Sequence, residues 1–176
     1  MSQMQWENNV EPAVLFVCLG NICRSPMAEG AFRNAAEKAG LSVKVDSAGT
    51  AAYHIAEPPD PRAISTAARY GVDISQLRGR QLADEDFERF THILAMDTAN
   101  MAGISARTPR QATAQVGLLM NVFEDHTDSS VADPYYGDDD DFEKCWTVIS
   151  EAVDALIRQL VSQGRGESRT KQTIAQ

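Results

Sequence analysis

Residues 18–25, CLGNICRS, combine a cysteine thiol and an arginine guanidinium with small and turn-forming residues. The segment lies between an apolar run and a sequence typical of a helix start, so its backbone N–H groups can turn inward and bind an anion at the helix N-terminus. Five residues separate Cys18 from Arg24, enough for the chain to loop once around a phosphate-sized anion while the guanidinium binds two of its oxygens. The same positive environment stabilises a thiolate, so Cys18 is predicted to be a nucleophile.

Cys18 has a simpler interpretation as a buried core cysteine at the end of a strand. For an isolated cysteine in such a position, that interpretation would be preferred. It does not explain the combination of residues that follows between a predicted strand and a predicted helix: Gly20, Asn21, Ser25 and Pro26. The sequence therefore favours an anion-binding loop with a functional cysteine.

The elements around this loop alternate between strands and helices. Apolar or alternating runs predict strands at residues 13–17, 43–47, 92–96 and 116–120. Helices are predicted at residues 26–39, 61–70, 98–104 and 139–161, the first with Ser25 as its N-cap and Gly40 at its end. This alternation predicts an α/β fold, a single three-layer domain with a four-stranded parallel sheet flanked by helices. The phosphate-binding loop between the first strand and the first helix then lies at the carboxyl end of the sheet, where active sites of such folds form.

Composition and charge favour a single folded domain and argue against a nucleic-acid-binding or membrane protein. The chain has 176 residues, of which 43% are hydrophobic and 23% charged, as expected for one folded domain. We expect this domain at residues 11–163, a flexible N-terminus at 1–10 and a disordered polar tail at 164–176. The formal net charge of −9 argues against nucleic acid as a partner. No run is apolar enough for membrane insertion, and three cysteines without a signal peptide predict a reduced, cytoplasmic protein.

Two long motifs carry a family resemblance. VLFVCLGNICRSPMAEG, residues 14–30, resembles the phosphate-binding signature of the low-molecular-weight protein tyrosine phosphatases, and DPYYG, residues 133–137, resembles the acid-bearing loop of that family. The likeness covers roughly residues 13–163 and is closer to the bacterial branch of the family than to the animal branch. Three shorter segments are also similar and follow in the same order: Asp46-Ser47-Ala48-Gly49-Thr50, Asp60-Pro61-Arg62 and Met96-Asp97.

The resemblance implies a role for each matching residue. Cys18 would attack phosphorus and become a phosphocysteine, while Arg24 would bind the equatorial phosphate oxygens. Asp133 would protonate the leaving phenolate and later accept a proton from the attacking water. Ser25 would donate its hydroxyl to the thiolate, and Asn21 would hold the loop in a left-handed conformation with side-chain hydrogen bonds. No metal or cofactor is needed, because the remaining contacts to phosphate come from backbone N–H groups of Leu19, Gly20, Ile22 and Cys23.

Aromatic residues near the acid predict an aryl substrate. Tyr135 and Tyr136 would form one wall of a slot deep enough for an aryl phosphate, in which a shorter phosphoserine would not reach the cysteine. Leu19 and Tyr53 are the candidates for the opposite wall. Tyr53 departs from the family pattern, since relatives often carry tryptophan near this position.

A second departure concerns the support of the loop. Many relatives have a histidine that contacts the serine and asparagine of the loop, and this chain has Gln76 and Leu77 in that segment. We expect the loop either to be looser here or to be held by other groups.

The remaining candidate residues could have either a purely structural role or a chemical one. Cys23 is either a packed residue under the helix start or a partner that forms a reversible disulfide with Cys18 after oxidation, and both stay open. Cys145 is predicted to be a core residue, and His54 a surface or structural histidine. The acidic run 138–141 is predicted to be the solvated start of a helix rather than a metal site.

The resemblance implies phosphotyrosine-containing proteins as partners, among them a bacterial tyrosine autokinase, with phosphate or vanadate as ligands of the site. Export as an effector is an open alternative. A thiol-coupled arsenate reductase would need further cysteines, and none lies between Cys23 and Cys145. A non-catalytic phosphotyrosine-binding module would be favoured by loss of the nucleophile or the acid, and both are present. The net negative charge predicts that acidic sequences around the phosphotyrosine are disfavoured.

Overall fold

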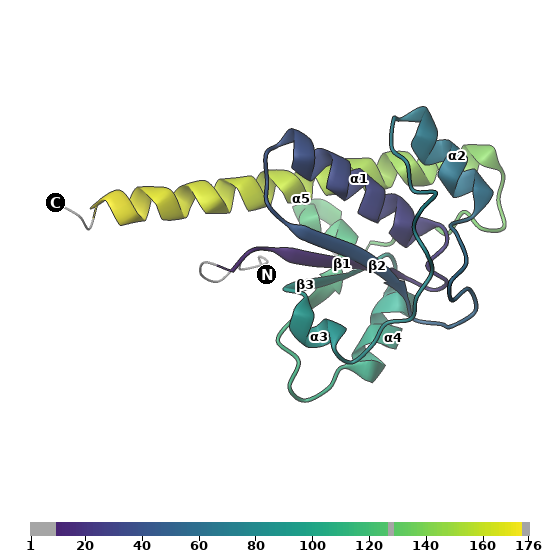
Figure 1. The fold of residues 1–176 in the computed structure, drawn as a ribbon, viewed down its shortest axis with the longest axis horizontal. Helices are drawn as coiled ribbons and strands as arrows, with labels where there is room; N and C mark the ends of the chain where they lie inside the picture. Colours follow the sequence, from purple (N-terminus) through teal and green to yellow (C-terminus); the bar gives the residue numbers. More distant parts are fainter. Residues whose placement is uncertain (1–9, 127–128, 174–176) are drawn as a thin grey trace.

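Within the residues that the computed structural model describes, 10–126 and 129–173, four parallel strands form one sheet. They are β1 (Ala13–Cys18), β2 (Lys44–Gly49), β3 (His92–Ala95) and β4 (Gln115–Leu118), in the order β2-β1-β3-β4. Helices α1 (Arg24–Lys38), α2 (Pro61–Arg69) and α5 (Asp139–Thr173) cover one face, and α3 (Asp86–Arg89) and α4 (Thr98–Arg107) cover the other (Figure 1). The predicted three-layer α/β fold is confirmed.

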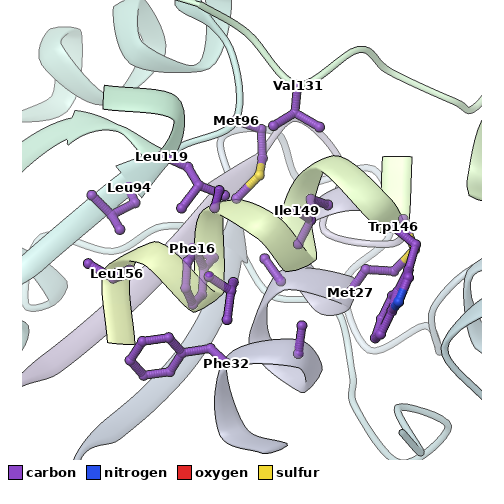
Figure 2. Packing of buried hydrophobic residues seen from close by; sticks show 14 of the residues in the cluster. Phe16, Met27, Phe32, Leu94, Met96, Leu119, Val131, Trp146, Ile149 and Leu156 are labelled. Carbon is purple, nitrogen blue, oxygen red and sulfur yellow. The ribbon is translucent and has the colours of Figure 1, made fainter. Parts of the chain in front are cut away.

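The central strand β1 is buried along its whole length, and its side chains alternate between two hydrophobic clusters. Phe16 packs with Phe32 of α1 and with Ile149 and Leu156 of α5, as Figure 2 shows. Leu15 joins the cluster on the opposite face. Burial on both faces explains why the run reads as continuously apolar. It also fixes the position of Cys18 at the carboxyl end of the strand, directly before the loop.

The start of α1 differs from the prediction. The helix begins at Arg24, its N-cap is Cys23, and no side chain caps it. Ser25 is therefore inside the first turn and is not the N-cap, because its hydroxyl is held within the loop by Asn21 Nδ2 at 2.9 Å. The N–H groups of this turn have no partner within the helix, which leaves them suited to an anion. The helix ends as predicted, with Gly40 at φ 64°.

Helix α5 also differs from the prediction. It begins at the acidic run as expected, and the backbone N–H groups of Asp138 and Asp141 each donate to the other residue's carboxylate, at 3.1 and 3.2 Å. The helix continues past the predicted end at Val161 to Thr173 and so extends into the segment 164–173. The segment contains glycine but no proline, and glycine costs only about 1 kcal/mol in a helix. Residues 174–176 and all of the predicted flexible N-terminus except Val10 lie outside the described residues.

Smaller elements fill the connections. The four-residue helix α3 was not predicted, because so short a segment shows no helical period. The predicted strand at 116–120 is β4 followed by a 3₁₀ turn, η1 (Leu119–Val122), and η2 (Glu124–His126) lies just beyond it. No helix in the described part of the chain has the length and apolar character needed to cross a membrane.

Candidate active site

The loop between β1 and α1 surrounds the sulfur of Cys18. Cys18 is the last residue of β1 and is 3% exposed. Its Sγ accepts a hydrogen bond from the backbone N–H of Asn21 at 3.3 Å and lies 3.0 Å from the hydroxyl oxygen of Ser25. Both contacts can stabilise negative charge on sulfur. The predicted pairing of Cys18 with Ser25 is present in the structure.

Asn21 holds the loop in the way the sequence predicted. Its φ is 57°, in the left-handed region, and its Nδ2 donates to the hydroxyls of Ser25 and Ser47 at 2.9 and 3.0 Å. Its Oδ1 accepts from the backbone N–H of Arg80 at 3.0 Å. Three of the four hydrogen bonds that the amide can make are thus directed to the loop and its surroundings.

In this structure Asn21 is held by groups other than a histidine. Gln76 is exposed, and Leu77 packs against the core cluster under α1. Beyond the loop, the partners of Asn21 are the Ser47 hydroxyl and the backbone N–H of Arg80.

Beneath Ser47 lies a buried carboxylate that the sequence analysis missed. Glu29 of α1 is 2% exposed, accepts from Ser47 Oγ at 2.7 Å and pairs with Arg33 at 2.6 Å. Burial raises the pKa of Glu29 although both hydrogen bonds oppose the shift. A single acidic residue in the otherwise apolar segment Met27–Phe32 is the sequence feature that could have indicated a buried carboxylate.

Arg24 is fixed by acidic groups from two distant segments. Its guanidinium is buried, with Nη1 2.6 Å from Asp97 Oδ2 and Nη2 3.4 Å from Asp133 Oδ2. Nη1 also donates to the carbonyl of Val131 at 3.0 Å. Burial opposes its charge, but the Asp97 hydrogen bond and nearby negative charges outweigh burial and raise the pKa of Arg24. The guanidinium is therefore charged and pre-oriented.

Asp97 is the second residue with a role at the site that the sequence analysis did not assign. It follows β3 and is the N-cap of α4, where its Oδ1 accepts from the backbone N–H of Asn100 at 2.6 Å. One carboxylate oxygen thus caps a helix while the other binds Arg24. An aspartate between a predicted strand and a predicted helix was the signal that could have found it.

Asp133 lies on the loop before α5. Its side chain is 43% exposed, and its Oδ1 accepts from the backbone N–H of Tyr135 at 3.1 Å. The other oxygen faces Arg24. The fold therefore brings the predicted nucleophile, guanidinium and acid together from positions far apart in the sequence.

Comparison with known proteins identifies the family of this chain. Residues 13–166 match the family model of the low molecular weight phosphotyrosine protein phosphatases. The chain belongs to this family. It is accordingly a protein tyrosine phosphatase, a phosphoric monoester hydrolase.

Individual members of the phosphatase family give the extent of the similarity. The chain is 44% identical to the low molecular weight phosphotyrosine protein phosphatase of Schizosaccharomyces pombe, over 76% of this chain and 86% of that protein. It is 37% identical to the low molecular weight protein-tyrosine-phosphatase YfkJ of Bacillus subtilis, over 84% and 95% respectively. A crystal structure of the protein tyrosine phosphatase from Entamoeba histolytica, with Hepes in its active site, superposes with a TM-score of 0.81 at 31% identity, covering 88% of this chain and 99% of that one. Relatives are both eukaryotic and bacterial, so the expected closeness to the bacterial branch is not supported.

The predicted aryl slot of this phosphatase is only partly formed by packed side chains. Tyr135 is 39% exposed, and a groove of about 330 Å³ extends beside it to Ile22 and the proline-rich segment 57–61. Tyr136 packs edge-on against Tyr135 but is 95% exposed. Tyr53 is exposed, and the segment before it is joined to the loop by a hydrogen bond from Ala51 N–H to the Leu19 carbonyl at 3.0 Å.

All three cysteines of the phosphatase lie in the described residues and are free and buried. Cys145 is in the core, as predicted, and burial raises its pKa to about 12. Burial, with a contribution from Asp60, also raises the pKa of the Cys23 thiol. His54 is half-buried and lies 2.6 Å from Glu57.

Proposed function

We propose that this phosphatase hydrolyses phosphotyrosine in proteins through a phosphocysteine on Cys18. The proposal depends on the geometry around the Cys18 sulfur. The Cys18 sulfur lies 3.0 Å from the Ser25 hydroxyl, inside a loop whose Arg24 is charged and 3.4 Å from Asp133. Nucleophile, anion-binding cation and proton donor are the minimal set for this chemistry.

In the first step, the Cys18 thiolate attacks phosphorus. A phosphorus–sulfur bond forms while the bond to the tyrosine oxygen breaks. The departing phenolate has a conjugate-acid pKa of about 10, so a proton from Asp133 accelerates its departure. The Arg24 guanidinium and the backbone N–H groups of Leu19 to Ser25, including those of Gly20, Ile22 and Cys23, bind the three equatorial oxygens.

In the second step, water attacks the phosphocysteine. Asp133, now a carboxylate, takes a proton from that water, and the bond between phosphorus and Cys18 sulfur breaks. The thiolate that leaves is stabilised by the Ser25 hydroxyl and the Asn21 N–H, both within hydrogen-bonding distance of the sulfur. Inorganic phosphate is released, and vanadate would compete for the same loop.

The substrate class follows from the surroundings of the loop. Tyr135, Tyr136, Leu19 and Tyr53 are all at least 39% exposed, so they can contact the ring of an aryl phosphate. The formal net charge of −9 disfavours acidic sequences next to the phosphotyrosine. A tyrosine kinase that phosphorylates itself, in the cytoplasm, is a suitable protein substrate.

The experiment measures hydrolysis of a phosphotyrosine peptide by the parent enzyme, Cys18→Ser and Cys145→Ala. We expect Cys18→Ser to lose at least about 1000-fold in kcat, because serine is a far weaker nucleophile. Cys145→Ala, which removes a buried thiol from α5, controls for thiol loss and retains turnover. Retained turnover in Cys18→Ser would refute the mechanism. Equal rates on a phosphoserine peptide of the same sequence would refute the aryl slot.

A further inference from the structure

Arg62 is held in one orientation by its neighbour Asp60. Asp60 is the N-cap of α2, and its carboxylate accepts from Nε and Nη2 of Arg62 at 3.0 and 2.9 Å as well as from the Arg62 backbone N–H at 2.8 Å. Such a two-point contact fixes the plane of the guanidinium. The Arg62 hydrogen bond lowers the pKa of Asp60, so the pair remains charged in neutral solution.

This fixed pair is connected to the phosphate-binding loop. The backbone N–H of Asp60 donates to the carbonyl of Ile22 at 2.8 Å, and Ile22 lies within the loop. The Arg62 guanidinium also lies over the ring of Phe142, with its central carbon 4.5 Å from the ring centroid. Phe142 is fully buried in α5. Arg62 is therefore positioned relative to both the loop and the helix that follows Asp133.

The free donors of Arg62 bind the backbone of the acid-bearing loop. Nη2 donates to the carbonyl of Tyr135 and Nη1 to the carbonyl of Gly137, both at 3.1 Å. On the other side of Asp133, the carbonyl of Val131 accepts from Arg24 at 3.0 Å and its N–H donates to Met96 at 2.7 Å. Asp133 thus lies between two anchored points of the chain, and Arg62 supplies the second.

Proton transfer from Asp133 requires its carboxyl group to be within hydrogen-bonding distance of the leaving oxygen. Its side chain is 43% exposed, so few packing contacts hold it, and its Oδ1 accepts from the backbone N–H of Tyr135, whose carbonyl Arg62 binds. We propose that Arg62 is a positioning residue that couples the acid-bearing loop to the phosphate-binding loop and so aligns Asp133 for proton transfer. The inference rests on the proposed role of Asp133.

The test compares Arg62→Gln with Arg69→Gln, using kcat/KM for phenyl phosphate and for p-nitrophenyl phosphate. Nitrophenolate is a much better leaving group and needs less help from an acid. We expect Arg62→Gln to lose about tenfold or more on phenyl phosphate, or about 1.4 kcal/mol, and less than about threefold on p-nitrophenyl phosphate. Arg69 is on the same helix and pairs with Glu143 of α5, so Arg69→Gln removes a comparable bridge without touching the acid loop. It should show no selective loss.

A second comparison places Arg62→Gln in an Asp133→Asn background. Because Arg62 acts through Asp133, it should cause no further selective loss there. Arg62→Lys, which keeps the charge but not the two-point geometry, should show the same leaving-group pattern as Arg62→Gln. An equal loss on both substrates, or an additional selective loss in the Asp133→Asn background, would overturn the inference while leaving the mechanism intact. If Asp133→Asn itself shows no selective loss on phenyl phosphate, the acid assignment fails and the role of Arg62 fails with it.

Discussion

Nη1 of Arg24 lies 2.6 Å from Oδ2 of Asp97, and this pair joins the loop after β1 to the N-terminus of α4. The Arg24 side chain is 3% exposed and that of Asp97 22%. Neutralising one partner of such a shielded pair removes a restraint on the other. We therefore expect Asp97 to help orient the guanidinium that we propose binds phosphate.

Asp97→Asn is predicted to lower kcat for aryl phosphates by about tenfold, or about 1.4 kcal/mol. Asparagine still caps α4 and still accepts a hydrogen bond, so the fold is retained. KM should change less, because loss of a negative charge near bound phosphate offsets the poorer orientation of Arg24. Steady-state kinetics check this, and an unchanged kcat would show that Asp97 only caps the helix.

Asn21 combines a left-handed backbone with side-chain hydrogen bonds, and two substitutions separate these contributions. Asn21→Gly tolerates φ 57° and removes only the hydrogen bonds to Ser25, Ser47 and Arg80. Asn21→Ala also strains the backbone, by about 1 kcal/mol or more. Both variants should lose activity, and urea unfolding should find the alanine variant the less stable. Equal stability of the two would contradict a backbone contribution.

Buried His92 predicts a pH-dependent stability. It is 2% exposed in β3, and burial lowers its pKa to about 4. The unfolded chain, with a histidine pKa of about 6.5, binds a proton first as the pH falls. Stability should therefore decrease between about pH 6.5 and 4, by at most about 3 kcal/mol from this residue.

The measurement compares urea unfolding of the parent and His92→Asn at several pH values. The variant is expected to be less stable at pH 7 but to have a flatter profile through this range. Glu29 contributes with the opposite sign, because its pKa is raised on folding, so the difference between variant and parent is the informative quantity. Parallel profiles would contradict the assignment to His92.

Cys23 is predicted to protect Cys18 from irreversible oxidation. Peroxide converts the Cys18 thiolate to a sulfenic acid, and the Cys23 thiol can condense with it, forming a disulfide and releasing water. Burial raises the pKa of Cys23, so this condensation should be slow. We expect thiol to restore activity to the peroxide-treated parent but not to Cys23→Ser. Equal recovery would favour the interpretation of Cys23 as a packed residue.

The fold and the main site residues could be predicted because their signals are local. The apolar run of β1, the spacing from Cys18 to Arg24 and the conformational tolerance of Asn21 can each be recognised within a short segment. The resemblance supplied Asp133, which no local pattern distinguishes from an ordinary loop acid.

The features that were missed depend on the packed structure. Asp97 and Glu29 reach the site only after β3 and α1 are in place. Ser25 resembles an N-cap in the sequence, but its hydroxyl is used by the loop, so the helix starts earlier. The predicted end of α5 at Val161 is too early, because a polar segment without an apolar face is typical of disorder but does not prevent a helix.

In the proposed mechanism, Cys18 carries the phosphoryl group between the two steps. The most direct test of this mechanism is rapid-quench mass spectrometry of Asp133→Asn during turnover of p-nitrophenyl phosphate, because this variant forms the intermediate with a good leaving group but hydrolyses it slowly. We expect the peptide containing Cys18 to gain the mass of one phosphoryl group, and Cys18→Ser in the same background to abolish this adduct. Turnover without an adduct on Cys18, or an adduct on another residue, would contradict the mechanism.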